Sequence, residues 1–291
     1  MPSERRPGRH VEDTSVAAPP GGPGSAHRRH DECLIGRASI AAMHAVATIA
    51  AAVLGAGVGA LLPLPTYRMS VSTGSPPAAE CPHCQAPLPA GVRGWIGYGT
   101  CRSCGNPYTT PRRYYVVVAA VAFALLGWRL QHRSLGEDLL LAAWLVLAGA
   151  GIWLAAIDLH VQRLPTEIVG GTAAVCGSLI VGAALVGDRP RLAVTAGIAA
   201  AAVWLAYLAM AMLAPGQLGA GDIRLAALCG LLLGTHGWGA VVLGSAVPLL
   251  LSGVVAAVLL RAKRVRRRDL VPLGPYLIGG ALLAAILTQN S

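Results

Sequence analysis

Apolar stretches that approach the length needed to cross a bilayer recur along this chain. They lie at about residues 40–63, 114–131, 138–157, 167–187, 192–213, 223–235, 237–260 and 272–288. Hydrophobic residues make up 55% of the sequence and charged residues only 12%, a composition that excludes a soluble globular protein. Because helices satisfy their own backbone groups in lipid, we predict an all-α polytopic membrane protein with about eight transmembrane helices.

One of these stretches, Ile223–Thr235, is too short to cross a bilayer unaided. It adjoins the next stretch through Gly237, and glycine readily adopts the backbone conformations that end a helix. A tilted or broken helix is therefore expected at this point.

The chain divides into four parts on this interpretation. Residues 1–36 are rich in Pro, Gly, Arg, Ser and His and have few bulky apolar residues, so we predict a disordered N-terminal extension. A first transmembrane helix is expected over residues 37–63, a polar loop over 64–113, and the remaining helices over 114–291. An apolar run directly follows Met43, which leaves open whether the native chain starts there or at Met1.

Basic residues predict the orientation in the membrane. The net charge of +10 would suit nucleic acid, but Arg and Lys lie at the N-terminus and in loops, as in cytoplasmic loops of membrane proteins, so no nucleic-acid partner is expected. The densest run, Arg261–Arg268, should lie in the cytoplasm. Counting back span by span places 214–222, 158–166 and 64–113 on that same face.

The loop over residues 64–113 contains two Cys-x-x-Cys pairs. Cys81 and Cys84 form the first, Cys101 and Cys104 the second, and residues 85–100 separate them. This spacing is typical of four thiolates that bind a tetrahedral zinc ion, and the alternative of two disulfides fits a reducing cytoplasm poorly. We predict a structural zinc module with His83 on its surface. The remaining cysteines have no partners at metal spacing: Cys33, Cys176 and Cys229.

Two acidic residues occur where lipid is expected, although the chain has only 13 Asp and Glu. Asp158 ends the third apolar stretch, just before a helix-breaking Leu164-Pro165 step. Asp222 closes the segment Gly219-Ala220-Gly221-Asp222 and opens the sixth stretch. Because two spans separate these acids, both return to the same membrane face. The simpler interpretation is that each one only caps a helix.

A pair of carboxylates on one face has the chemistry of an aspartic protease. One ionised carboxylate activates water, and its protonated partner donates to the scissile carbonyl. The start of a helix favours negative charge and its end disfavours it, so Asp222 is expected to be the base and Asp158 the protonated partner. The flanking Gly219 and Gly221 leave room for a substrate backbone near Asp222.

These residues resemble the type IV prepilin peptidases, bacterial membrane aspartic proteases of the Gly-x-Gly-Asp type. The similarity covers about residues 45–285 and follows the family's order of motifs: Tyr67-Arg68 after the first span, the four cysteines, Asp158 with Leu164-Pro165, Gly219–Leu225, and Pro272–Tyr276. It implies that Asp158 and Asp222 are catalytic and that four residues support them: Gly219, Gly221, Arg224 and Pro165.

The resemblance further implies a substrate and a location. The family removes a short basic leader from prepilins or pseudopilins, just after a glycine, at the cytoplasmic face of the bacterial inner membrane. Many members also methylate the new N-terminus with S-adenosylmethionine. Here the cysteine pairs are closer together, Gly91–Trp95 replaces a Pro-rich stretch, and Tyr114–Ala119 has no acidic residue. These departures lie in the methylase region, so methylation and its cofactor stay open while proteolysis is implied.

An ion-coupled transporter is the main alternative, because broken helices and intramembrane carboxylates also occur in transporters. Acidic residues of transporters typically lie near the middle of a span, whereas Asp158 and Asp222 lie at helix ends. Transporters are also often built from two repeated halves, and we detect no internal repeat in this sequence. A zinc-stabilised scaffold without catalysis would leave this same-face pair of acids without a role. The sequence therefore favours a peptidase and leaves its oligomeric state open.

Overall fold

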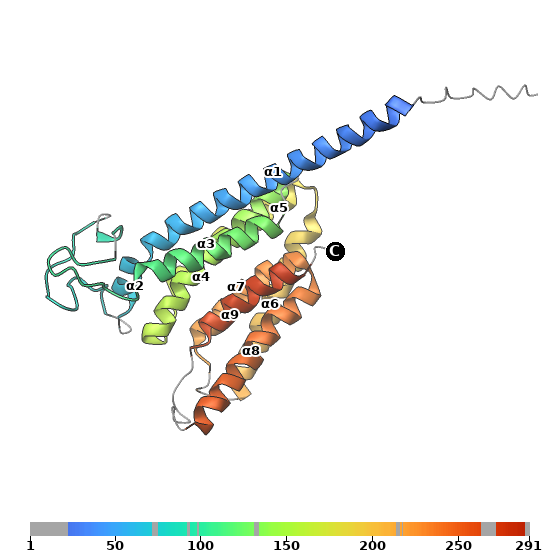
Figure 1. Cartoon of the computed structure of the whole chain (residues 1–291). Helices are drawn as coiled ribbons and strands as arrows, with labels where there is room; N and C mark the ends of the chain where they lie inside the picture. The colour runs from blue at the N-terminus through green and yellow to red at the C-terminus, as the bar shows by residue number, and fades with distance from the viewer. Residues whose placement is uncertain are drawn as a thin grey trace, which may run out of the picture. The chain divides into compact units, whose positions relative to one another are not determined.

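The computed structural model describes residues 23–288 except 72–74, 92–93, 98, 131–133, 214–215, 217 and 263–271, and it describes side chains from Ala42 onward except at 256 and 259. The regular secondary structure of the described chain is helical apart from two isolated β-bridges in the polar loop. Its helices, labelled in Figure 1 except for the single-turn η2, are α1 (Pro23–Leu61), α2 (Pro63–Met69), α3 (Arg112–Arg129), α4 (Leu135–Val161), α5 (Thr166–Val186), α6 (Pro190–Leu213), α7 (Ala220–Leu233), η2 (Gly234–His236), α8 (Trp238–Arg261) and α9 (Gly274–Leu287).

All of the predicted apolar stretches are helical, as α1 and α3 to α9. Within the described part of the chain, five helices are long and apolar enough to cross a membrane: Ala42–Leu61 of α1, α4, α5, α6 and Trp238–Val255 of α8. The protein is therefore an all-helical, multi-pass membrane protein. The 14 residues of α9 extend only about 21 Å, less than a hydrocarbon core of about 30 Å, so the number of eight crossings stays a prediction.

The break predicted near Gly237 is confirmed. Helix α7 ends at Leu233, one 3₁₀ turn follows, and Gly237 has a φ of 95° before α8 begins at Trp238. A positive φ of this kind strains residues that carry a Cβ, so glycine allows the chain to leave one helix and start the next.

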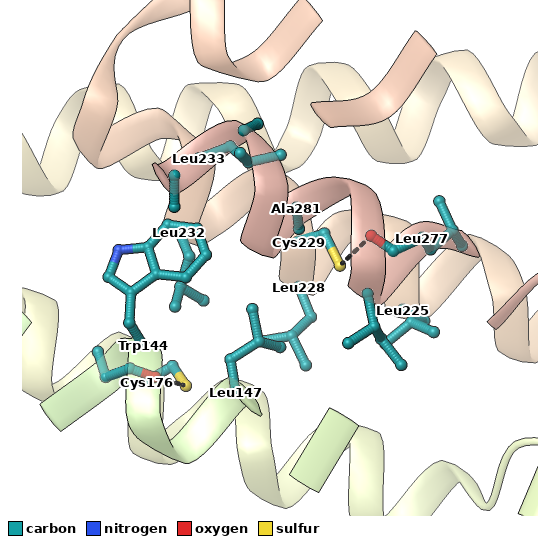
Figure 2. Close-up of a cluster of buried hydrophobic side chains, with 14 of the residues drawn as sticks. Trp144, Leu147, Cys176, Leu225, Leu228, Cys229, Leu232, Leu233, Leu277 and Ala281 are labelled. Atoms are coloured by element: carbon teal, nitrogen blue, oxygen red, sulfur yellow. Dashed lines mark hydrogen bonds between the residues drawn. The ribbon is translucent and has the colours of Figure 1, made fainter. Parts of the chain in front are cut away.

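Short helix α7 lies at the centre of the apolar core. It contacts α5, α6, α8 and α9, which explains how a helix too short to span the bilayer is still accommodated. Figure 2 shows its side chains meeting those of α4, α5 and α9 in one cluster: Trp144, Leu147, Cys176, Leu225, Leu228, Cys229, Leu232, Leu233, Leu277 and Ala281. Cys176 and Cys229, which have no partners at metal spacing, are both buried here and pack as small apolar residues.

Two glycines allow α1 to lie directly against α3. A Cβ at Gly55 would collide with the backbone oxygen of Ala119, and one at Gly59 with the backbone oxygen of Tyr115. Small residues spaced four apart commonly permit such close helix contacts in membranes. This contact holds α1 against the start of α3, on either side of the polar loop.

Some predictions fall on parts of the chain that are not described. The disordered extension over residues 1–36 stays a prediction for residues 1–22, and from Pro23 onward the backbone is in α1. The side chain of Cys33 and most of the basic run Arg261–Arg268 also lie outside the described residues.

Candidate active site and cysteine cluster

The end of α4 is shaped by the predicted helix break. Gln162 adopts a left-handed conformation with a φ of 51°, and its N–H donates to the backbone oxygen of Asp158 at 2.8 Å. Leu164 and Pro165 then form the connection to α5, which begins at Thr166. Asp158 is thereby held in the last turn of α4.

The side chain of Asp158 is buried, with 3% of its surface exposed. Its Oδ2 accepts a hydrogen bond from the backbone N–H of Gly274, the first residue of α9, at 3.0 Å. A Cβ on Gly274 would lie 2.9 Å from the same oxygen, so only glycine leaves the carboxylate this position. The sequence motif Pro272–Tyr276 therefore has a structural role, because it brings a backbone donor to Asp158.

Asp222 lies in the first turn of α7. Its Oδ2 accepts a hydrogen bond from the backbone N–H of Gly219 at 3.2 Å, and its side chain is less deeply buried than that of Asp158. Gly219 has no side chain to return a bond, so only one half of a capping box exists. The predicted helix cap is therefore present through Oδ2 of Asp222 alone.

Gly221 brings the start of α7 against the connection that follows Asp158. A Cβ on Gly221 would lie 2.9 Å from the Cβ of Leu164, so a larger residue would push the two segments apart. The bond from Gly274 to Asp158 and the contact of Gly221 with Leu164 place Asp158 and the start of α7, which carries Asp222, around the same connection.

The helix environments of Asp158 and Asp222 are more alike than their positions in the sequence predict. Asp158 does lie at the end of its own helix, but its carboxylate also faces the start of α9 through Gly274. Free N–H groups at a helix start favour negative charge on either acid. The two carboxyl groups therefore differ less in how strongly their helix ends favour ionisation than helix position alone predicts.

Arg224, in the supporting motif, lies one residue past Ile223 on the exposed side of α7. Its Nη1 donates to Oγ1 of Thr166 at 2.7 Å. Thr166 directly follows Pro165, so this bond joins α7 to the start of α5. Together with the Gly221 contact, it fixes α7 relative to the chain that carries Asp158.

The four predicted cysteines form one cluster. All of their Sγ atoms lie within 4.8 Å of one another. Cys81 and Cys104 are 3.9 Å apart, and Cys84 and Cys101 are 3.6 Å apart. Thiolates around a tetrahedral zinc, each about 2.3 Å from the metal, are separated by about 3.8 Å, so this cluster has the size that a zinc ion requires.

Two turns of the same construction hold the sulfurs. The N–H of Gln85 donates to the backbone oxygen of Cys81 at 3.0 Å, and that of Gly105 to Cys101 at 2.9 Å. Gln85 and Gly105 both have a positive φ, 57° and 74°. In the second turn, the N–H groups of Cys104 and Ser103 lower the pKa of the Cys101 thiol to about 6. That shift favours the thiolate, which is the form that binds metal.

His83 is exposed, as predicted, and is not part of the sulfur cluster. Its Nε2 lies 3.2 Å from the backbone oxygen of Pro107 in the other turn, so it helps to pair the two turns.

Helix α2 attaches the cysteine loop to the membrane helices. Tyr67 donates from its hydroxyl to the backbone oxygen of Glu80 at 2.7 Å, and its ring stacks on Tyr108. Arg68 donates from Nη1 to the oxygen of Gly94 at 2.9 Å, with its guanidinium 4.7 Å from the centre of the Trp95 ring. The sequence located Tyr67-Arg68 by resemblance but gave no role to either residue.

Comparison with known proteins agrees with this geometry. Residues 139–261 match the model of the type IV leader peptidase family. The chain is similar to this family over these residues. A prepilin leader peptidase/N-methyltransferase of Bacillus subtilis (strain 168) is 28% identical over 214 residues, which cover 72% of this chain and 81% of that relative. No solved structure matches the chain significantly.

Both similarities indicate an aspartic peptidase of the prepilin peptidase type. The segment that matches the family contains both Asp158 and Asp222. The four cysteines precede that segment and Gly274 follows it. The candidate site therefore consists of the family segment and the backbone N–H of Gly274 in α9, which donates a hydrogen bond to Asp158. The cysteine loop precedes this segment in the sequence.

Proposed function

We propose that this leader peptidase removes leaders from prepilins or pseudopilins with Asp158 and Asp222 as its catalytic pair. The proposal is supported by the contact of Gly221, at the start of α7 beside Asp222, with the connection that follows Asp158, within a segment that matches the leader peptidase family. The glycines around them keep the site free of bulky side chains.

The chemistry follows from two carboxyl groups that share one proton. Asp222, the more accessible of the two, takes a proton from a water molecule as that water attacks the scissile carbonyl carbon. Asp158 gives its proton to the carbonyl oxygen, and the backbone N–H of Gly274 holds its carboxylate in place. The C–N bond of the resulting gem-diol then breaks as the leaving amine takes the proton from Asp222 and one hydroxyl of the gem-diol returns a proton to Asp158, which restores the pair. The products are a leader with a new carboxyl end and a mature chain with a new amino end.

The proposed site lies at the cytoplasmic face of the bacterial inner membrane. This placement follows from the basic loops of the sequence, which include the cysteine loop with Arg68 and Arg102 on the same face as both aspartates. We infer that α3, α7 and α9 cross the membrane with the five longer helices because neighbouring helices cover them.

The cysteine cluster is proposed to hold one zinc ion through Cys81, Cys84, Cys101 and Cys104. Four thiolates complete a tetrahedral shell, so the ion would supply structural cross-linking and leave no position open for substrate. The loop would then be fixed on α2 as a rigid unit beside the membrane helices.

The transporter alternative finds no support in the position of the acids. Asp158 lies in the last turn of α4 and Asp222 in the first turn of α7, both at helix ends. A buried binding site at mid-span is what the transporter interpretation requires.

Co-expression with candidate prepilins tests the proposal. Membranes that contain the wild-type protein are expected to convert a prepilin to a shorter form cut after a glycine, as read by mass spectrometry. The same reaction with labelled S-adenosylmethionine measures methyl transfer, which the name of the Bacillus subtilis relative includes. Failure of the correctly inserted protein to shorten any prepilin would contradict the proposal.

The bond from Arg224 to Thr166 is expected to position Asp222 for this reaction. Thr166→Val removes the hydroxyl, and we expect kcat for leader cleavage to fall about fivefold to tenfold with KM unchanged, because a bond to a charged group contributes about 1–2 kcal/mol. Thr166→Ser keeps the hydroxyl and should retain the wild-type kcat. A wild-type kcat in Thr166→Val, or an equal loss of kcat in Thr166→Ser, would contradict a positioning role for this bond.

A further inference from the structure

A groove of about 350 Å³ lies between three membrane helices at the end where the cysteine loop joins them. It is lined from Tyr114 to Ala122 of α3, from Ile152 to His160 of α4, and from Pro275 to Leu282 of α9. Each helix therefore contributes about 10–12 Å of its length. Neither catalytic candidate, Asp158 or Asp222, lines this groove, so it is separate from the carboxylate pair.

The two ends of the groove differ in polarity. Polar groups line it only where α3 and α9 begin and α4 ends, and they include Thr110, Tyr114 and His160. Farther along the helices the lining is apolar, as far as Ala122 on α3 and Leu282 on α9. A ligand with a polar head and an apolar chain matches this gradient.

A positive charge lies beside the polar end. The guanidinium of Arg113 is 5.1 Å from the centre of the Tyr114 ring, and Tyr114 lines the groove. None of the described residues that line the groove is acidic. Arginine and hydroxyl groups are hydrogen-bond donors that suit the oxygens of a phosphate. The polar end therefore favours an anionic head group.

The side of the groove is open to the surroundings of the helices. More than half of the side-chain surface of Tyr114, Val118 and Leu159 is exposed, and all three line the groove. In a bilayer such apolar side chains face acyl chains. Gly279 lines the groove from α9, and a Cβ at this position would meet no atom within 4 Å. An acyl chain can therefore enter from the side without displacing a helix.

We propose that this groove is a binding site for an anionic phospholipid. One acyl chain lies against α3, α4 and α9, and the phosphate lies beside Arg113 and Tyr114. Charge complementarity selects this occupant, because basic pockets between membrane helices bind anionic head groups. A lipid without net charge would fill the apolar part but would offer no net charge to Arg113. The site goes beyond leader cleavage and does not depend on it.

Lipid binding to the full-length protein in detergent tests the head-group end. Native mass spectrometry measures binding of phosphatidylglycerol, which is anionic, and of phosphatidylethanolamine with the same acyl chains. We expect the wild type to bind phosphatidylglycerol about fivefold more tightly, and Arg113→Gln to lose this preference with its affinity for phosphatidylethanolamine unchanged. Arg191→Gln is the matched control and should keep both wild-type affinities, because Arg191 is exposed and is the second residue of α6, as Arg113 is of α3.

A second variant tests the acyl-chain end. Gly279→Leu places a side chain in the open part of the groove, and we expect it to lower the affinity for both lipids about tenfold. Gly197→Leu, at an equally open and exposed glycine of α6, should change neither affinity. A phosphate ion held by Arg113 alone would not respond to Gly279→Leu, so this variant separates a bound lipid from a bound ion.

Two results would overturn the proposal. Equal affinity of the wild type for the two lipids, or an unchanged affinity of Arg113→Gln for phosphatidylglycerol, would remove the anionic head-group site. Unchanged lipid affinities in Gly279→Leu would show that the lipid does not lie in this groove. A loss of cleavage activity in any variant bears on the proposed function and leaves the lipid measurement unaffected.

Discussion

Asp158→Asn and Asp222→Asn, each expressed and inserted at the wild-type level, are expected to lose leader cleavage by about 10⁴-fold. The expectation follows from a pair that shares one proton, because an amide can neither take the proton from water nor give one to the carbonyl oxygen. Both amides can still accept the backbone bonds from Gly274 and Gly219, so the fold should persist. Prepilin shortening in isolated membranes is the measurement.

A third acid provides the control for these variants. Asp188 is exposed in the turn between α5 and α6, and its φ of 49° is a conformation that Asn also tolerates. Asp188→Asn should therefore cleave prepilin at the wild-type rate. Cleavage within tenfold of wild type by Asp158→Asn or Asp222→Asn would contradict the catalytic pair, and a loss in all three variants would point to folding rather than chemistry.

Much of this arrangement could be predicted from local patterns in the sequence. The helices follow from long apolar stretches, the break at Gly237 from a short stretch next to a glycine, and the cysteine cluster from its spacing. The expectation that Asp158 and Asp222 lie at the same membrane face followed from counting spans. Each of these predictions uses only the length of an apolar stretch, the spacing of residues, or whether the number of spans between two residues is even. The sequence gives all three directly.

Contacts between distant segments could not be predicted in this way. The bond from Gly274 to Asp158 joins residues 116 positions apart, and that from Arg224 to Thr166 joins residues 58 apart. Their formation depends on how the helices pack, and packing is not visible in the hydropathy of one segment. The same reason explains α7, whose burial among four helices lets it be shorter than a bilayer.

Purified without chelator, the protein is expected to contain about one zinc per chain, and replacing all four clustered cysteines by Ser should reduce this to about zero. Metal ligation supplies about 10–16 kcal/mol in small zinc modules, and this loop has few buried apolar side chains of its own to replace that free energy. The Ser variant should therefore also become sensitive to protease between α2 and α3. Metal analysis and limited proteolysis measure the two effects.

Cys176→Ala is the matched control, because Cys176 is buried in the apolar core and lies outside the cluster. It should retain zinc and protease resistance. Protein that contains no zinc but has two disulfides by thiol titration would contradict the metal site. If the Ser variant loses zinc and still cleaves a prepilin at the wild-type rate, the metal site stands and the loop is dispensable for proteolysis. That outcome would confine the catalytic machinery to α4, α7 and α9, where the two carboxylates lie.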